Sequence, residues 1–442
     1  MNRKHPLYNV PLPGGWELVT VDDLKAREPH SCVAGPFGSS ISSKYFMPEG
    51  VPVIRGSNLR DDLTPFVPKG FVYVSEEQAK KYKAQHVTAG DLVFTCWGTV
   101  GQVGLIPEDG PFREYIISNK QLKLRPDIKR AIPRFLFYYF AGPEMVKHIL
   151  NRAIGAAVPG INLGILKSLE VALPPLPTQR KIAAILSAYD DLIENNLRRI
   201  NILEEMVQNL YREWFVKFRF PGHQHARFTD SPLGRIPEGW DVKVMSDAVT
   251  IRPSLPVPKN EQVPFIPMGR LSENSMLIGE AEYRPKATGS RFQNGDTLFA
   301  RITPCLENGK TGFVQFLPTG DTIACGSTEF IVLRSRTVCP EYVYLMARSD
   351  LFRDNAIKSM SGATGRQRVR EECFDQFLLA QPPDSILERF QITTRPQFQM
   401  IHSLNRRNQS LRHTRDLLLP KLISGEVDVS KLDIAVPEEA AA

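Results

Sequence analysis

The stretch Leu12-Pro-Gly-Gly-Trp16-Glu17 recurs in the middle of the chain as Ile236-Pro-Glu-Gly-Trp240-Asp241. Later in each half a Gly-Asp step leads into an apolar run, at Gly90-Asp91 and at Gly295-Asp296. Because the order of these motifs is preserved, the sequence predicts a tandem duplication of about half a chain. The tryptophans are 224 residues apart and the Gly-Asp steps only 205, so we expect two related modules that differ in their loops.

Length and composition set the class of protein. A chain of 442 residues exceeds what one hydrophobic core usually organises, so it favours two globular modules. The net charge of +7 and the pI near 9.0 fit a polyanionic partner without requiring one. The six cysteines form no Cys-x-x-Cys pair, which favours a reducing compartment and argues against structural zinc. With no secretory signal and no apolar run of membrane length, we expect a soluble cytoplasmic protein.

The first module is predicted to be α+β. Short runs rich in strand-forming residues are separated by Gly and Pro, as in an irregular sheet. A helix is predicted at 133–151, where Pro133 can occupy the first turn and apolar residues recur at helical spacing. The predicted strands are Val51–Ile54, Phe71–Val74, Asp91–Cys96, Gln102–Ile106 and Gln121–Leu124.

A long helical pattern follows each module. From Thr178 to about Phe218 there is no Gly or Pro, and apolar residues recur every three or four positions, which predicts a rod of about 60 Å. The second pattern starts at the capping-box sequence Asp384-Ser385-x-x-Glu388 and stops at Gly425, with Pro396 expected to kink it. The first helix is rich in acids and the second in arginine, so antiparallel pairing as a coiled-coil spacer is predicted.

These patterns divide the chain into five parts. We expect a first recognition module at 1–177 and a central helical region at 178–219. A linker and a second module follow at 220–383, a C-terminal helical region at 384–425 and a flexible tail at 426–442. The fold predicted is therefore two homologous α/β modules separated by two long antiparallel helices, with a pseudo-twofold internal repeat.

The sequence contains no complete catalytic motif. Asn308-Gly-Lys-Thr311 lacks the first glycine of a phosphate-binding loop, because Pro304 stands there. His223-x-His225 has no third metal ligand nearby, and no tetrapeptide of the kind that amino-methyltransferases use is present. We therefore predict no catalytic, cofactor or metal-binding residue. Two alternatives stay open: part of a combined restriction-methylation enzyme or an unrecognised nuclease, and a scaffold with lectin-like or peptide-binding modules.

Both modules carry polar side chains suited to ligand recognition at corresponding places in the sequence. Polar side chains on loops that follow strands are suited to base edges, and Gly lets the backbone approach phosphates. Residues 155–162 fit a hinge and a phosphate loop equally well, whereas Arg366 and Arg368 favour phosphate. The predicted DNA-binding residues are Arg55, Ser57, Asn58, Trp97, Thr99, Asn119 and Lys120 in the first module, and Arg270, Arg301, Thr303, Asn308, Lys310, Ser327, Thr328, Arg366 and Arg368 in the second.

Together with the Trp motifs and Gly90-Asp91, three sequences carry a family resemblance: Leu173-Pro-Pro-Leu-Pro-Thr-Gln-Arg-Lys-Ile-Ala-Ala-Ile185, Arg212-Glu-Trp-Phe215 and Leu419-Pro-Lys-Leu-Ile-Ser-Gly425. Over nearly its whole length the chain resembles the specificity subunit of type I restriction-modification systems. It departs from the pattern at the start of the second helix, where Gln381 to Arg389 is degenerate.

The resemblance implies two target-recognition domains, each reading one half of a split asymmetric double-stranded DNA sequence. It implies that the helices dock two methyltransferase subunits, which carry S-adenosylmethionine. Two restriction subunits, which use ATP and Mg, could then join. A rigid spacer would set the half-sites about one helical turn apart.

Overall fold

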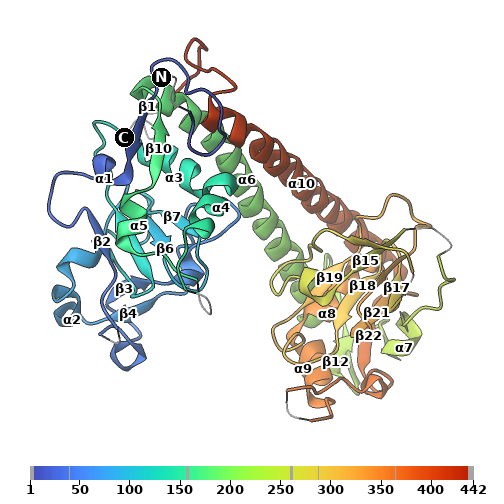
Figure 1. The fold of residues 1–442 in the computed structure, drawn as a ribbon. Helices are drawn as coiled ribbons and strands as arrows, with labels where there is room; N and C mark the ends of the chain where they lie inside the picture. The colour runs from blue at the N-terminus through green and yellow to red at the C-terminus, as the bar shows by residue number, and fades with distance from the viewer. Residues whose placement is uncertain are drawn as a thin grey trace. The chain divides into compact units, whose positions relative to one another are not determined.

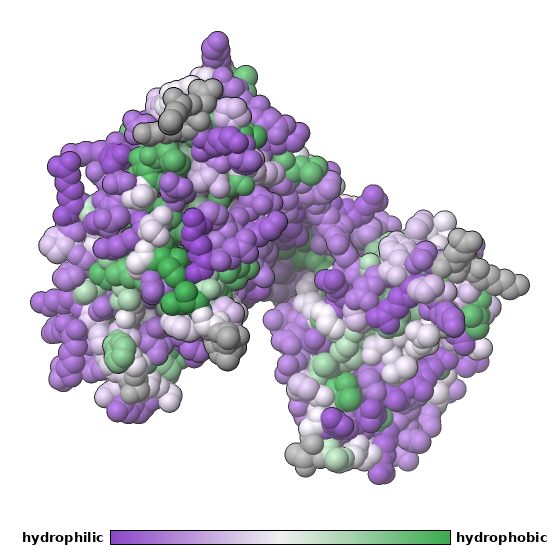
Figure 2. Space-filling model, viewed as in Figure 1, coloured by the Kyte–Doolittle hydropathy of each residue, from purple (hydrophilic) through white to green (hydrophobic). Residues whose placement is uncertain are grey.

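The computed structural model describes residues 4–38, 40–155, 159–258, 262–286, 288–363 and 365–436. The chain forms two compact units, which we call the first unit (residues 1–193 and 410–442) and the second unit (194–409). Both units are α+β, as predicted (Figure 1). The face drawn in Figure 2 is largely hydrophilic, with apolar side chains in smaller areas. Within the described ranges, no helix is long and apolar enough to cross a membrane.

The first unit contains two four-stranded sheets and a two-stranded ribbon. The first sheet is antiparallel, whereas in the second sheet β3 pairs with β8 in parallel. The first sheet has the order β2 (Cys32–Ala34), β9 (Gln121–Leu124), β6 (Leu92–Thr95) and β7 (Val103–Leu105), the second has the order β4 (Val72–Val74), β3 (Val51–Ile54), β8 (Tyr115–Ile117) and β5 (His86–Val87), and the ribbon joins β1 (Glu17–Thr20) to β10 (Glu170–Leu173).

The second unit repeats this topology strand for strand, including the one parallel pair, β15 with β20. The duplication predicted from the sequence motifs is therefore present in the fold. Its strands are β14 (Val249–Ile251), β21 (Phe330–Ser335), β18 (Thr297–Ala300) and β19 (Thr311–Phe313) in one sheet, β16 (Glu282–Arg284), β15 (Val263–Ile266), β20 (Ala324–Gly326) and β17 (Ser290–Phe292) in the other, β13 (Asp241–Val244) with β22 (Leu378–Gln381), and the hairpin β11 (Phe228–Ser231) with β12 (Gly234–Pro237).

The repeated Gly-Asp step is explained by a buried ion pair. Asp91 is 1% exposed and accepts two hydrogen bonds of 2.7 Å from Nε and Nη2 of Arg125. Asp296, also 1% exposed, accepts the same two bonds at 2.7 Å from Arg334. The preceding glycine has a positive φ in both units, +84° and +91°, a conformation that other residues rarely adopt. Each step thus turns the chain tightly into the strand and anchors it.

The helix predicted at 133–151 is two helices, α3 (Pro133–Ala141) and α4 (Pro143–Asn151). The prediction of one helix was wrong because Pro143 disfavours a helical conformation at the preceding residue, and Gly142 is extended with ψ 143°. The second unit breaks at the matching place, between α8 (Pro340–Arg348) and α9 (Asp350–Lys358). The shorter helices are α1 (Val21–Leu24), α2 (Glu76–Lys80), α5 (Leu163–Lys167) and α7 (Met245–Ala248).

The two long helices are α6 (Leu176–Tyr211), which continues as a π-helical turn at Arg212–Val216, and α10 (Asp384–Ser424). They lie side by side in Figure 1. Pro396 does not end α10, although the carbonyl of Ile392 loses its helical donor there.

In the first unit the helices are antiparallel and joined by a buried ion pair. Nη1 of Arg415 donates to Asp190 at 2.6 Å, and Lys181, earlier in α6, donates to the carbonyls of Ser430 and Leu432, beyond the end of α10. The opposite charges predicted to pair thus do so at Asp190.

In the second unit the helices are also antiparallel, but an amide pair joins them. Nδ2 of Asn196 donates to Oδ1 of Asn408 at 2.7 Å, and both side chains are buried. Trp214, near the end of α6, packs on Phe390, near the start of α10. Arg395 departs from the predicted pairing, because it contacts Glu341 of α8.

The duplicated tryptophan motif lies at the end of a long helix in each unit. Gly425 stops α10 with φ +74°, and a Cβ added there would lie 2.4 Å from Pro13 and 3.3 Å from the Trp16 ring. Trp240 packs instead on aromatic side chains just after α6, with ring centroids 6.0 Å from Phe215 and 5.3 Å from Phe220. Each unit therefore covers the end of the helix that starts in the other unit.

Residues 426–436, expected to belong to a flexible tail, pack on the first unit. Val429 is 1% exposed and belongs to the same hydrophobic cluster as Leu422 and Ile423. The rest of the predicted tail, 437–442, lies outside the described residues.

Candidate nucleic-acid interface

Three loops of the first unit meet at one end of its sheets. The parallel strands β3 and β8 end at the same edge, and the amide of Ser118 donates to the carbonyl of Ile54 at 3.2 Å. Strand β6 ends beside them, because Thr95 pairs with Gln121 and the amide of Cys96 donates to the carbonyl of Lys120 at 2.8 Å. The topology therefore brings together the loops at 55–58, 96–102 and 118–120, which carry the predicted recognition residues of the first module.

Within these loops the predicted residues have different environments. Arg55, Ser57 and Lys120 are exposed. Asn119 is also exposed, but Nδ2 of its amide donates to the carbonyl of Gly38 at 2.9 Å, and the Thr99 hydroxyl donates to Gln102. The exposed group thus combines two cations with short polar side chains, a composition suited to phosphate and base edges.

Asn58 is a correction to the predicted set. Its side chain is 0% exposed, Oδ1 accepts from the amide of Arg55, and Nδ2 donates to the carbonyls of Val67 and Lys69 at 3.0 and 2.9 Å. The amide therefore holds the loop at 55–58 in place and is not available to a base.

Trp97 adds apolar surface at the same end of the unit. The residue is 42% exposed and forms a β-bridge with Gly160. A Cβ added at Gly160 would lie 2.6 Å from the indole ring, so only glycine leaves room for the ring there. Gly160 belongs to the segment 155–162 predicted as a hinge or phosphate loop, of which 156–158 lie outside the described residues.

The second unit repeats this framework in its backbone hydrogen bonds. The amide of Ser327 donates to Ile266, that of Arg301 to Glu329 and that of Val369 to Arg301, at 3.0, 3.0 and 2.9 Å. In the first unit the corresponding bonds join Ser118 to Ile54, Cys96 to Lys120 and Ile161 to Cys96.

The equivalent positions carry different side chains. Arg301 takes the place of Cys96, and Glu329 takes the place of Lys120. Arg368 takes the place of Gly160, because it forms the bridges to residues 302 and 361 that Gly160 forms to 97 and 154. The framework is thus constant while the groups it presents differ.

Those groups form an ion-pair network in the second unit. Glu329 accepts from Nη2 of Arg368 at 2.8 Å and from Nε of Arg301 at 3.1 Å. Arg301 also donates to Glu371 at 3.2 Å, and Arg252 lies 2.6 Å from the same carboxylate. The hydrogen bond from Arg368 is the largest influence on the Glu329 carboxyl and lowers its pKa.

Glu329 was not among the residues predicted to bind DNA, although it directly follows the predicted residues Ser327 and Thr328. Position 329 is equivalent to Lys120 in the internal repeat, and this equivalence could have identified it.

The other predicted residues of the second unit are spread over this end and its borders. Arg270, Thr328 and Arg366 are exposed, and Ser327 and Lys310 are partly buried. Thr303 is 9% exposed, and its hydroxyl accepts from the amide of Gln367, so it supports the loop. Asn308 donates to Glu273 at 3.1 Å and therefore lies beside the loop at 272–275.

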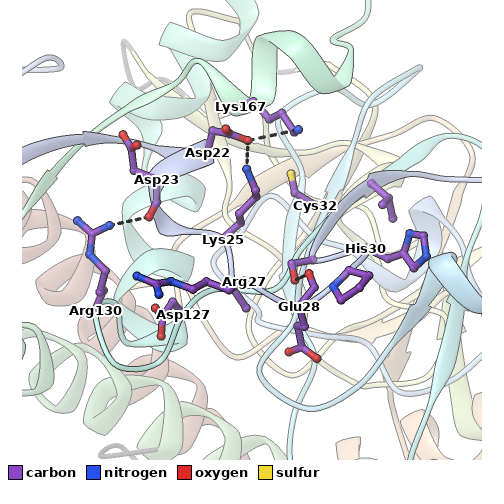
Figure 3. A pocket seen from close by; sticks show the side chains of 14 residues that line it. Asp22, Asp23, Lys25, Arg27, Glu28, His30, Cys32, Asp127, Arg130 and Lys167 are labelled. Atoms are coloured by element: carbon purple, nitrogen blue, oxygen red, sulfur yellow. Dashed lines mark hydrogen bonds and ion pairs between the residues drawn. The ribbon is translucent and has the colours of Figure 1, made fainter.

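An open pocket of about 620 Å³ lies at the opposite end of the first sheet, near the paired residues Cys32 and Leu124 (Figure 3). Two of its lysines pair with one aspartate: Asp22 lies 2.5 Å from Lys25 and 3.3 Å from Lys167. Among the residues that the structure describes, no group of three or more His, Cys, Asp or Glu could hold a metal ion. The pocket and the recognition loops are thus separate features of the first unit.

Known proteins share this architecture. Residues 35–205 match the family model of the type I restriction modification DNA specificity domain. The MjaIX type I restriction enzyme specificity subunit of Methanocaldococcus jannaschii is 23% identical, with 95% of each chain covered. The HindI specificity subunit of Haemophilus influenzae is 22% identical over 72% of this chain and 83% of its own length. A crystal structure of a type I restriction-modification S subunit from M. genitalium has the same fold, with a TM-score of 0.55, 13% identity, and 93% of this chain and 98% of that chain covered.

A DNA specificity domain in a duplicated α+β framework with two long helices places the chain in the class of DNA target-recognition proteins. The resemblance stated from the sequence is confirmed, and the chain is a specificity subunit of the type I restriction-modification family.

Proposed function

We propose that each unit reads one half of a bipartite, asymmetric DNA site. The observation that supports this is the repeated loop framework, which holds Lys120 in one unit and Glu329 with Arg368 in the other. Equal frameworks predict that both units approach DNA in the same way. Different side chains predict that they select different bases, because base edges are distinguished by donor and acceptor patterns in the major groove.

The helices α6 and α10 act as the spacer of this proposal. A stiff protein can engage one face of B-DNA only at intervals of about one helical turn, which fixes the distance between half-sites. Exposed cations such as Arg55, Lys120 and Arg366 supply phosphate contacts. Affinity for duplex DNA is then expected to fall steeply as salt is raised. A scaffold with lectin-like or peptide-binding modules would not show this dependence.

Methylation and cleavage belong to partner subunits in this proposal. This chain recognises the DNA sequence, two methyltransferase subunits methylate it with S-adenosylmethionine, and restriction subunits carry out ATP- and Mg-dependent cleavage. A surface suited to docking lies on α6 in the second unit. There Ile202 and Met206, one helical turn apart, are 56% and 51% exposed.

Replacement of residues 10–150 by the matching segment of a relative tests whether each unit reads its own half of the DNA site. We expect only one half of the recognised sequence to change, because the second unit keeps all its loops. The recognised sequence is read from the methylated sites of cells that carry the chain with its methyltransferase partner. A change in both halves would contradict the proposal. So would modification or cleavage of DNA by the purified chain alone with S-adenosylmethionine and Mg²⁺, which the combined-enzyme alternative predicts.

The double substitution Ile202→Glu and Met206→Glu is expected to weaken association with the methyltransferase subunit at least about tenfold. Two carboxylates would be desolvated in an apolar contact. Association is measured by titrating purified subunits, and Val257→Glu, at an apolar side chain that is 62% exposed, is the matched control. Unchanged association in the double variant would place the docking surface elsewhere.

A further inference from the structure

We propose that Glu329 is a positioning residue for base reading in the second unit, and that it orients Arg368 toward a guanine. The inference rests on the proposed function and assigns it to particular atoms. The positive net charge of the chain does not by itself predict a carboxylate or an ion pair at this position. Phosphates repel an acid near DNA unless cations neutralise it.

The contact between Glu329 and Arg368 engages the side edge of the guanidinium. Nε of Arg368 donates to both carboxylate oxygens, at 3.1 and 3.0 Å, and Nη2 donates to Oε1 at 2.8 Å. A guanidinium has five N–H donors in a fixed fork. With the side edge occupied, the end edge, formed by Nη1 and the second hydrogen of Nη2, stays available.

The available edge fits one base. Among the described residues, Nη1 of Arg368 has no hydrogen-bond partner, and the side chain is 48% exposed. Two parallel N–H donors match O6 and N7 of guanine in the major groove, and no other base presents two acceptors there. The geometry therefore points to a guanine in the half-site read by the second unit.

The Glu329 carboxylate is itself fixed by a second arginine, Arg301. Arg301, whose side chain is 23% exposed, donates to Glu329 and to Glu371, and Glu371 also contacts Arg252. A free arginine on a surface would lose side-chain entropy on binding a base, whereas one fixed beforehand loses less. Three arginines against two glutamates also leave this group net positive, so it does not repel DNA.

The equivalent positions in the first unit lack this glutamate–arginine ion pair. Lys120 and Gly160 stand where Glu329 and Arg368 stand in the second unit. The first unit therefore has no equivalent ion pair that fixes a guanidinium, so this mode of guanine reading is expected in one half-site only.

The test uses the purified full-length chain and a pool of duplex DNA of randomised sequence, from which bound molecules are selected and sequenced. Arg368→Lys is expected to lower the preference for guanine at one position by about tenfold, because an ammonium cannot form the fork. Glu329→Gln is expected to lower the preference at that same position by several fold and to leave the other positions unchanged. Glu282→Gln is the matched control, since Glu282 pairs with Arg284 on β16 at 2.8 Å.

A merely structural Glu329 would lower affinity for all sequences evenly, and that result would overturn the inference. So would an unchanged guanine preference in Glu329→Gln, or effects of the two variants at different positions. If Glu329→Gln fails to fold, as judged by thermal unfolding, Arg368→Lys tests the guanine contact, because it keeps a cation beside the carboxylate. An unchanged guanine preference in Arg368→Lys would then overturn the inference. Selection of no two-part sequence by the wild-type chain would instead refute the proposed function.

Discussion

Asp296→Ala is expected to destabilise the second unit by about 3–5 kcal/mol, the usual cost of removing one partner of a buried ion pair. Asp296 is 1% exposed and binds Arg334 through two hydrogen bonds of 2.7 Å. It also accepts from the amide of Gln293 at 2.8 Å, which fixes the turn before β18. Alanine leaves a half-buried guanidinium and a backbone donor without their acceptor. Because a domain is stable by only about 5–15 kcal/mol, much of that margin is lost.

The measurement is unfolding in urea, followed by tryptophan fluorescence and circular dichroism. Asp91→Ala removes the same geometry from the first unit and should cost a similar free energy there, so the duplication provides an internal replicate. Glu280→Ala, at an exposed acid of the second unit, is the control and should change stability by less than about 0.5 kcal/mol. A loss below about 1 kcal/mol in both aspartate variants would show that the ion pair does not anchor the strand.

Gly35→Ala is expected to displace the loop at 118–120 and to weaken recognition by the first unit at least about tenfold, the equivalent of one bidentate base contact. A Cβ added at Gly35 would lie 1.9 Å from the carbonyl oxygen of Ser118 and 2.8 Å from its carbonyl carbon. Both atoms belong to the backbone, so no side-chain rotation relieves the overlap. Gly35 cannot retreat easily either, since its amide donates to the carbonyl of Gln121 at 2.8 Å.

Binding of the purified chain to duplex DNA that contains its recognised sequence measures this effect. Changes of base within the half-site of the first unit should matter less to the variant than to the wild-type chain. Gly14→Ala is the matched control, because a Cβ there has no atom within 4 Å. Wild-type affinity and base preference in Gly35→Ala would mean that the loop at 118–120 does not read DNA.

The parts of the fold that could be predicted are those whose causes lie close together in the sequence. A glycine with positive φ followed by a buried aspartate appears in the sequence as the dipeptide Gly-Asp, and this dipeptide identified both copies of the repeat. Strand β9 was predicted with its observed bounds because its four residues are bounded by turn-forming residues. The break at Gly142 was also local, but the apolar periodicity on both sides concealed it.

The site was harder to predict, because the orientation of a polar loop residue is decided by distant partners. Asn58 points inward to carbonyls nine and eleven residues away. Glu329 faces an arginine 39 residues further along the chain. Composition indicated which loops carry polar groups, but only the folded chain shows which of these groups support the loop and which are exposed.

The packing of α10 and residues 426–436 against the first unit has a consequence for biosynthesis. Leu419, Leu422, Ile423 and Val429 belong to the hydrophobic cluster of a unit whose other members come from residues 21–186. The second unit is one continuous stretch of chain, 194–409, and it leaves the ribosome complete. The unit whose synthesis begins first is therefore completed last, because part of its hydrophobic cluster is synthesised only at the end of translation.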